Sequence, residues 1–320
     1  MCEDPFLSVI VPIRNLEKYL PDCLKSFEGQ DHLFSYEIVC VDNASSDRSA
    51  EVIASFADRL PLSCVREETI SAAAARNAGI RAARGKYLWF VDGDDEAETG
   101  AFRALKGALR GEEQIFVFGA KVLNYSDRIR LRDITPTDNT YEGECLRAFY
   151  GEESCRPYVW NSIYRREFLL RNHLRFPEEC DRAEDVVFQF FCFEMASEVR
   201  FCSQSIYRYH HLRNPDSLMA EVAGREVLRL EECLRATERI VASRERGRSE
   251  PAFGRWLYEY LLLPVLRLSD RGEKRRLMLL VRERLLTKSK TDFSALPLLD
   301  RWKAFCFRYK ILLRLYFLFR

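Results

Sequence analysis

Three carboxylates stand within four residues in the segment Asp92-Gly93-Asp94-Asp95, directly after the apolar run Tyr87–Val91. Carboxylates this close repel one another, so a folded chain that holds them at the end of a buried strand needs a cation beside them. Mg²⁺ and Mn²⁺ prefer carboxylate and phosphate oxygens, and Mg²⁺ is often held by one or two carboxylates together with substrate phosphates. The segment therefore predicts a divalent metal site that receives a diphosphate. The alternative is an acidic turn in which an aspartate caps a helix over residues 97–109.

A fourth carboxylate, Asp42, ends the apolar run Tyr36–Val41. A carboxylate at a strand end can accept hydrogen bonds from a ribose hydroxyl or from the edge of a base. Ser46 and Asp47, which follow, are typical helix-capping residues, and capping accounts for them without a ligand. Asp42 is therefore the residue of this segment for which we expect a ligand.

Arg76 lies in the alanine-rich segment Ala74–Gly79, which predicts a helix packed closely on the sheet. Its guanidinium is a rigid fork of donors that suits a phosphate. An ion pair with an aspartate at a strand end is the alternative interpretation.

Glu184 and Asp185 open an apolar helical pattern. The helix dipole stabilises acidic residues at a helix N-terminus, and this explains the pair without any chemistry. In the other interpretation Asp185 is a general base that takes the proton of an acceptor hydroxyl.

His210, His211 and Arg213 follow a short strand pattern, so they are candidates for contact with a diphosphate or are simply polar surface residues. The four histidines show no metal-binding spacing such as H-E-x-x-H. The chain also lacks G-x-G-x-x-G and G-x-x-x-x-G-K-[ST], which argues against a dinucleotide-binding or P-loop enzyme.

The elements that must position these residues alternate between strand and helix. The apolar runs predict buried strands at Leu7–Val11, Tyr36–Val41 and Tyr87–Val91. Helical spacing predicts helices over 16–27, with Asn15 as its N-cap, and over 47–56 and 71–83. This alternation indicates an α/β fold with a mostly parallel sheet, in which the ligand crevice lies at the carboxyl ends of the strands.

The alternation fades near residue 120, and the pattern is helical from 220 onward. We therefore expect a domain over 1–219, divided near residue 119, and an all-α C-terminal region over 220–320 that is a candidate for binding a membrane or a partner.

The net charge of +1 conceals a basic end, because residues 271–320 hold 14 Lys and Arg against 4 Asp and Glu. Apolar residues from Trp302 to Phe317 recur there at helical spacing between the basic ones, so the segment either packs on preceding helices or lies on an anionic membrane surface. Nucleic acid is not an expected partner. The 11 scattered cysteines without a C-x-x-C pair indicate a reducing cytoplasm. We expect neither a signal peptide nor a membrane span, and we place the protein in the cytoplasm with the inner face of the cell membrane as a candidate site.

Four segments occur in an order and spacing that resemble the motif set of the family 2 glycosyltransferases: Ser8–Asn15, Val41–Ser49, Ala75–Gly79 and Phe90–Asp95. The resemblance is tight over residues 7–115 and looser to about 220, and it implies a nucleotide-sugar-binding half at 1–118 and an acceptor half at 119–219. It implies a GT-A fold, a nucleoside-diphosphate sugar donor with a UDP-sugar favoured, inversion at the anomeric carbon, and Mn²⁺ or Mg²⁺ as cofactor. The absence of a Q-x-x-R-W motif indicates an enzyme that adds one sugar at a time to a glycan or lipid-linked glycan, in polysaccharide or cell-envelope synthesis.

The resemblance also assigns roles by position. It implies that Pro12 and Asn15 line the nucleotide pocket, that Asp42 meets uracil or ribose, and that Arg76 approaches the phosphates. It implies that Asp185 is the catalytic base. Asp92, Asp94 and Asp95 resemble the D-x-D site, with the metal on Asp94 and Asp95. The remaining candidates for contact with the diphosphate or the acceptor are Glu184, Trp160, His211 and Arg213.

The chain departs from the family pattern at residues that contact base or sugar. Arg14 stands where an aromatic residue is usual, and Asn43 and Ala44 stand where an acidic residue and glycine are usual. Two other classes of function compete with the enzyme. A catalytically inactive sugar- or nucleotide-binding protein of this fold would lack Asp94, Asp95 or Asp185, and a nucleotidyltransferase would carry a Gly-rich basic loop where this chain has Pro12-Ile13-Arg14-Asn15.

Overall fold

The computed structural model describes residues 4–31, 33–124, 129–143, 145–150, 158–178, 183–211, 226–242, 251–286 and 291–308. The chain forms two compact units, residues 1–217 and 218–320, and each is described by itself.

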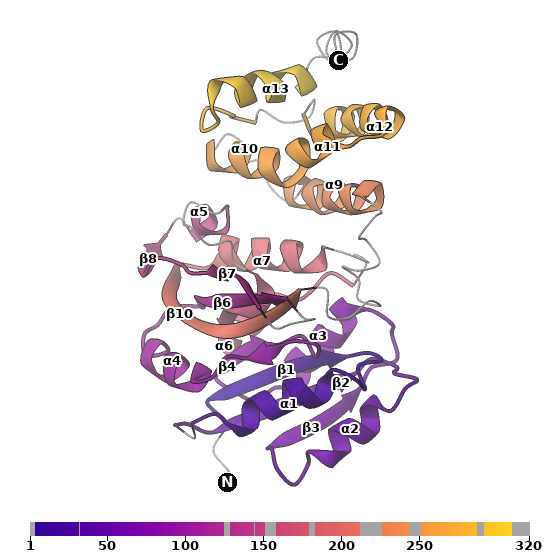
Figure 1. Cartoon of the computed structure of the whole chain (residues 1–320). Coiled ribbons are helices and arrows are strands. Elements are labelled where there is room, and N and C mark those ends of the chain that lie inside the picture. Colours follow the sequence, from indigo (N-terminus) through magenta and orange to yellow (C-terminus); the bar gives the residue numbers. More distant parts are fainter. Residues whose placement is uncertain are drawn as a thin grey trace. The chain divides into compact units, whose positions relative to one another are not determined.

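The first unit is built on one mixed sheet, which within the described residues has the strand order β3-β2-β1-β4-β9-β6-β10-β5, with β7 beside β6 and β8 beside β10 (Figure 1). The strands are β1 (Leu7–Ile13), β2 (Tyr36–Asp42), β3 (Leu62–Arg66), β4 (Tyr87–Phe90), β5 (Glu96–Ala97), β6 (Ile115–Asn124), β7 (Arg130–Ile134), β8 (Asn139–Glu142), β9 (Ser162–Arg165) and β10 (Glu198–His211).

The three strands expected from apolar runs are present, and they lie side by side. β1 pairs in parallel with β2, where Ile13 faces Asp42, and with β4, where Ile10 faces Phe90. Their side chains are buried on both faces, which explains why these runs are apolar throughout instead of alternating. The carboxyl ends of β1, β2 and β4 consequently share one edge of the sheet.

Helices connect and cover these strands: α1 (Leu20–Glu28), α2 (Ser49–Ser55), α3 (Ala72–Ala82), α4 (Ala101–Ala108), α5 (Cys145–Phe149), α6 (Arg166–Arg171) and α7 (Glu184–Met195), with a 3₁₀ turn at Val159–Asn161. α3 packs on β1 and β2, and its Gly79 has no room for a Cβ, which would lie 2.2 Å from Ile10 Cγ2. The small residues of this helix therefore permit the close packing that the sequence predicts.

Three helix starts differ from expectation. Helix α2 begins at Ser49 with Arg48 as its N-cap and no capping side chain, so neither Ser46 nor Asp47 caps it. Asn15 does not cap the first helix, because it adopts a left-handed backbone (φ 52°) and its Oδ1 accepts a hydrogen bond from Ser46 N in the neighbouring loop. The helix begins at Leu20, with Pro21 in its first turn. The helix expected over 97–109 begins at Ala101 after Gly100, which has a φ of 78°, so no aspartate caps it.

All regular elements that the structure describes in the second unit are helices. This unit contains α9 (Glu226–Ala242), α10 (Pro251–Leu257), a π-helical turn (Tyr258–Leu262), α11 (Leu263–Arg267), α12 (Arg271–Val281), a second π-helical turn (Arg282–Leu286) and α13 (Leu298–Arg308). No helix among the described residues is both long and apolar enough to cross a membrane. The predicted apolar stripe is described only to Arg308, and the rest of it lies outside the described residues.

Candidate active site

The aspartate segment forms a tight turn directly after β4. Asp95 N donates a hydrogen bond to Asp92 O at 2.9 Å, which closes the turn. A Cβ on Gly93 would lie 2.7 Å from Leu16 Cδ1, so the loop after β1 approaches the turn closely at this position. The turn thus lies at the edge shared by the carboxyl ends of β1, β2 and β4, as the sequence predicts.

Asp95 fastens this turn to β10. Its side chain is 2% exposed, its Oδ1 accepts from His210 N at 2.7 Å, and its Oδ2 accepts from the Tyr207 hydroxyl at 2.8 Å. Burial, followed by repulsion from Asp94 and Asp92, raises the pKa of the Asp95 carboxyl. Both oxygens are thus engaged with the protein itself, and the metal contact predicted for Asp95 stays a prediction.

Asp92 and Asp94 are the more accessible carboxylates of the turn. Asp92 Oδ1 accepts a hydrogen bond from Arg76 Nη2 at 3.0 Å. Among the described residues no three His, Cys, Asp or Glu side chains gather around one point. This donor set fits Mg²⁺ or Mn²⁺ if substrate phosphates complete the coordination, because hard cations accept one or two carboxylates together with phosphate oxygens.

Arg76 is buried between the aspartate turn and the start of α7. Its Nη2 binds Asp92, its Nη1 donates to Glu184 Oε1 at 2.7 Å, and its guanidinium lies 5.4 Å from the centre of the Phe176 ring. Burial alone would lower the pKa of Arg76, but Asp92, Glu184 and Asp185 outweigh it and raise that pKa. The geometry matches the ion-pair interpretation of Arg76, and the phosphate contact remains a prediction.

Asn77, the next residue, has a role that the sequence analysis missed. Its Nδ2 donates to Phe176 O and its Oδ1 accepts from Phe176 N, both at 2.9 Å. Arg76 and Asn77 together tie α3 to the segment that leads into α7. In the sequence, the signal for this role was an adjacent Arg and Asn within a predicted alanine-rich helix.

Glu184 and Asp185 form the first turn of α7, after Ala183 with a φ of 59°. Burial raises the pKa of Asp185, and the neighbouring Arg76 only partly opposes this effect. Because Arg76 contacts Asp92 and Glu184 directly, the structure brings the candidate base to the aspartate turn. A carboxylate whose pKa is raised is a better proton acceptor than an ordinary aspartate.

The loops after β1 and β2 hold the remaining predicted nucleotide contacts. Pro12 is partly exposed near the end of β1. Asp42 is buried, its Oδ2 accepts from Arg66 Nη1 at 2.6 Å, and its Oδ1 accepts from Ser45 N at 3.1 Å. Arg66, half exposed beside Asp42, is a cation at this edge that sequence reasoning missed.

Asn43 has a structural explanation for its departure from the family pattern. Its amide nitrogen donates to Glu67 O and Thr69 O, and its oxygen accepts from Ser71 N. An acidic side chain could not donate the first two bonds when ionised. Asn43 thus holds the loop between β3 and α3.

Trp160 lies at the centre of a stack of aromatic rings. Its ring is nearly parallel to Tyr158 on one side (4.8 Å, 5°) and to Tyr209 (5.7 Å, 6°). Burial and the charges of Asp95, Asp92 and Asp94 raise the pKa of Tyr209 to about 12, so the stack lies within the field of the aspartate turn. The tyrosines were not predicted as part of the site.

The histidines at the end of β10 have separate environments. His210 is buried, with Nε2 2.9 Å from Glu96 Oε1, whereas His211 is exposed and its ring lies 6.3 Å from that of Tyr209. Arg213 lies outside the described residues.

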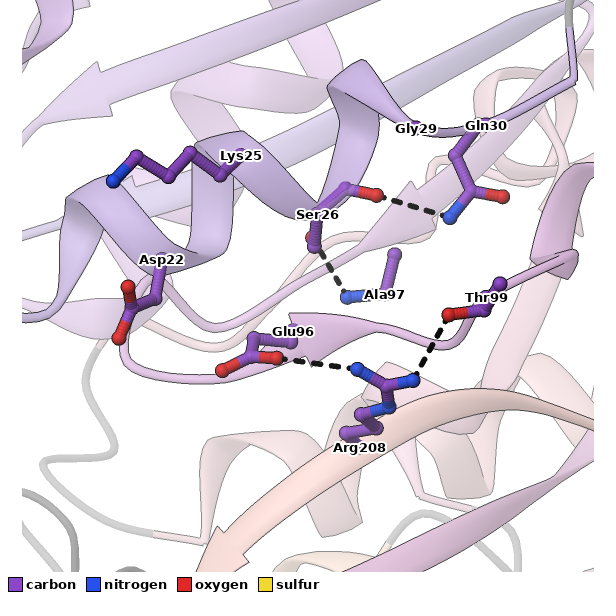
Figure 2. A pocket seen from close by; sticks show the side chains of 9 residues that line it. All are labelled: Asp22, Lys25, Ser26, Gly29, Gln30, Glu96, Ala97, Thr99 and Arg208. Atoms are coloured by element: carbon purple, nitrogen blue, oxygen red, sulfur yellow. Dashed lines mark hydrogen bonds and ion pairs between the residues drawn. The ribbon is translucent and has the colours of Figure 1, made fainter.

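A cavity of about 300 Å³ lies beside this site without including it. Figure 2 shows its lining, which comes from α1, β5 and β10, with Arg208 directed toward Glu96 and Thr99. None of the predicted donor-binding residues lines it. Arg208 is already paired with carboxylates of the protein, so its charge is not available to a ligand in this cavity.

The strand order, the acidic turn after β4 and the candidate base on α7 define a GT-A type of α/β protein. The model of the family described as "Glycosyl transferase family 2" matches residues 8–177. The chain belongs to this family.

Its relatives include EpsJ of Bacillus subtilis, an uncharacterized glycosyltransferase that is 32% identical over 224 residues, 67% of this chain and 63% of EpsJ. Another is TarS of Staphylococcus aureus, a poly(ribitol-phosphate) β-N-acetylglucosaminyltransferase that is 26% identical over 68% of this chain and 38% of its own length. The chain therefore spans less than two thirds of the length of either relative.

Solved structures confirm the expected fold. TarS residues 1–349 in complex with UDP-GlcNAc match with a TM-score of 0.61 and 21% identity, over 85% of this chain and 78% of that chain. The mannosyltransferase PcManGT of Pyrobaculum calidifontis, in complex with GDP-Man and Mn²⁺, matches with a TM-score of 0.58 and 18% identity, over 98% and 83%.

Proposed function

We propose that the protein transfers one sugar from a nucleoside-diphosphate sugar, with a UDP-sugar favoured, to a hydroxyl of a glycan or lipid-linked glycan, with inversion at the anomeric carbon. The observation that carries this proposal is the buried bridge from Asp92 through Arg76 to Glu184. It fixes the candidate base Asp185 beside the turn that would receive the donor diphosphate.

The donor would bind at the edge formed by Pro12, Asn15 and Asp42, within residues 1–118. Asp94 is the first choice for metal contact, because Asp95 is engaged with β10. A bound Mn²⁺ or Mg²⁺ would neutralise charge that develops on the leaving diphosphate. The complexes of PcManGT with Mn²⁺ and of TarS with UDP-GlcNAc support this choice of ligands.

The acceptor would bind within residues 119–219, on the side of Asp185 and the Trp160 stack. Asp185 takes the proton of the acceptor hydroxyl, and the oxygen attacks the anomeric carbon opposite the leaving group, so a single displacement inverts its configuration. The name of TarS, which acts on poly(ribitol-phosphate), supports an acceptor in a cell-envelope polymer.

The proposal is tested by a nucleotide-release assay over UDP-, GDP- and TDP-sugars with Mn²⁺ or Mg²⁺, with Asp185→Asn as the matched inactive control. We expect metal-dependent release from one nucleotide class by the natural chain and a large loss in the variant. Donor binding by the natural chain without release, in the presence of an acceptor panel, would favour the inactive binding protein instead.

A further inference from the structure

A second cavity, of about 350 Å³, lies at the opposite edge of the sheet from the candidate active site. Leu7 pairs with Tyr87 at the amino ends of β1 and β4, and Tyr87 pairs with Arg165 at the end of the antiparallel β9. The cavity is lined by residues next to these three positions, including Arg84, Lys86, Arg165 and Arg166. The seven residues of β1 separate it from the site edge, a distance of roughly 20 Å.

Two of its four basic side chains have structural partners. Arg84 donates through Nη2 and Nε to Glu37 Oε2, at 3.0 and 3.2 Å. Arg165 donates through Nη2 to Gly111 O at 2.6 Å and through Nε to Glu113 O at 3.3 Å. These two arginines hold the walls of the cavity, and their donors are largely used.

Lys86 and Arg166 are different. Lys86 is exposed, its ammonium lies 5.4 Å from the centre of the Tyr87 ring, and within the described residues it pairs with no carboxylate. Arg166 Nε is buried and, in the part of the chain that the structure describes, donates to no acceptor. A buried donor without an acceptor is costly, and no carboxylate of the described residues pairs with the partly exposed Arg166 side chain to offset its charge.

The acidic residues of the lining do not cancel these charges. Glu167 pairs with Arg171 of the same helix, so Asp4 is the lining carboxylate left to oppose the charges of Lys86 and Arg166. The cavity in Figure 2 has two basic lining residues, Lys25 and Arg208, and its arginine is paired with Glu96 and Glu98.

We propose that this second cavity binds a phosphate monoester, with the Arg166 guanidinium donating to phosphate oxygens and Lys86 supplying a point charge. Such a group carries nearly two negative charges at neutral pH, which matches the two cations. Arginine and lysine are the side chains that proteins use for this group. A volume of about 350 Å³ is at the small end of ligand pockets and accommodates the phosphate together with a small attached group.

The proposal does not rest on glycosyl transfer. It is tested by isothermal titration of the full chain with glycerol 3-phosphate and with inorganic phosphate. We expect Lys86→Met and Arg166→Gln each to weaken binding about tenfold or more, the effect of one lost charge-assisted hydrogen bond. Arg166→Lys retains the charge but not the forked donors of the guanidinium, so it should recover only part of the affinity. Asp4→Asn should strengthen binding.

Two controls separate this site from the others. Arg103→Gln removes an exposed arginine that pairs with Asp31 and does not line the cavity, so it should leave the titration unchanged. Asp94→Ala tests the candidate active site. Phosphate binding that falls with Asp94→Ala and not with Lys86→Met would overturn the proposal, as would no titration of the natural chain. Unchanged melting curves for Lys86→Met exclude a folding effect.

A vesicle experiment identifies the source of the phosphate. Sedimentation with phosphatidic acid vesicles that depends on Arg166, against phosphatidylcholine vesicles as control, would assign the phosphate to a lipid headgroup. Titration by glycerol 3-phosphate without vesicle binding would assign it to a soluble ester. Failure in both arms would contradict a phosphate site.

Discussion

Arg76 and Glu184 stand 108 residues apart in the sequence, yet Arg76 Nη1 donates to Glu184 Oε1 at 2.7 Å in a buried environment. The same guanidinium binds Asp92, so one side chain joins the helix after β3, the turn after β4 and the helix that begins with Glu184. Removal of one partner from a buried ion pair leaves an uncompensated charge, which is more costly than loss of the pair as a whole.

Arg76→Met should therefore lower the free energy of unfolding by about 3 kcal/mol or more, measured by urea denaturation. The double variant Arg76→Met/Glu184→Gln should recover part of that loss. Arg48→Met is the matched control, since Arg48 is exposed and its bond to Glu17 is worth at most about 1 kcal/mol. Equal losses for Arg48→Met and Arg76→Met would contradict the bridge.

Asp185→Asn keeps the shape of the side chain and removes the base. The turnover number should fall by a factor on the order of 10² or more, with donor affinity retained. Steady-state kinetics and a donor titration measure the two quantities separately. A turnover number within a few-fold of the natural chain would place the base elsewhere.

The pH profile provides a second test of Asp185. A general base works only when deprotonated, and burial raises the pKa of Asp185. The rate should accordingly decline as the pH falls through a midpoint above the ordinary aspartate value of about 3.9. A profile that is flat down to about pH 4 would argue against Asp185.

Substitutions of Asp94 and Asp95 should have different effects, the first on metal binding and the second on stability. Asp94→Ala is expected to abolish the Mn²⁺ dependence of donor binding at nearly natural stability, because Asp94 is partly exposed. Asp95→Ala should lower the melting temperature, because Tyr207 OH and His210 N lose their acceptor. Full activity in excess EDTA would refute the metal site altogether.

The raised pKa of Asp95 has a consequence for stability. A group whose pKa is higher in the folded state than in the unfolded state stabilises the fold below its unfolded pKa, and this contribution disappears as the pH rises through the folded value. In EDTA, the free energy of unfolding of the natural chain should therefore fall relative to that of Asp95→Asn as the pH rises above about 4. The pH dependence of the natural chain alone also contains contributions from other carboxylates with lowered pKa values, namely Glu37, Asp47 and Glu98. The comparison with Asp95→Asn is therefore the informative measurement. A difference that is constant with pH would contradict the shift.

The sequence predicts which residues lie at the carboxyl edge of the sheet better than it predicts the contacts that they make. Apolar runs that end at Asp42 and Asp92 indicate parallel strands, and parallel strands bring their carboxyl ends together, so these two carboxylates could be placed without coordinates. The bond from Asp95 to His210 spans 115 residues and depends on the register of β10, which no local pattern encodes. The prediction that Asn15 caps a helix was wrong for a similar reason. Capping involves residues close in sequence, whereas the hydrogen-bond partner of Asn15 is Ser46, which belongs to another loop.

The last prediction concerns α13, where four large apolar side chains are exposed: Leu298 (81%), Leu299 (67%), Trp302 (56%) and Phe305 (44%). Exposed apolar residues beside basic ones suit a membrane interface, where each basic residue near an anionic surface contributes about 1 kcal/mol. We expect the chain to sediment with anionic liposomes at low salt and not with neutral ones, and we expect Trp302→Ser to weaken this binding. Ile70→Ser is the control, because Ile70 is 63% exposed in the first unit. Equal sedimentation of the natural chain and a form without residues 296–320 would refute membrane contact through this segment and favour packing against other parts of the protein.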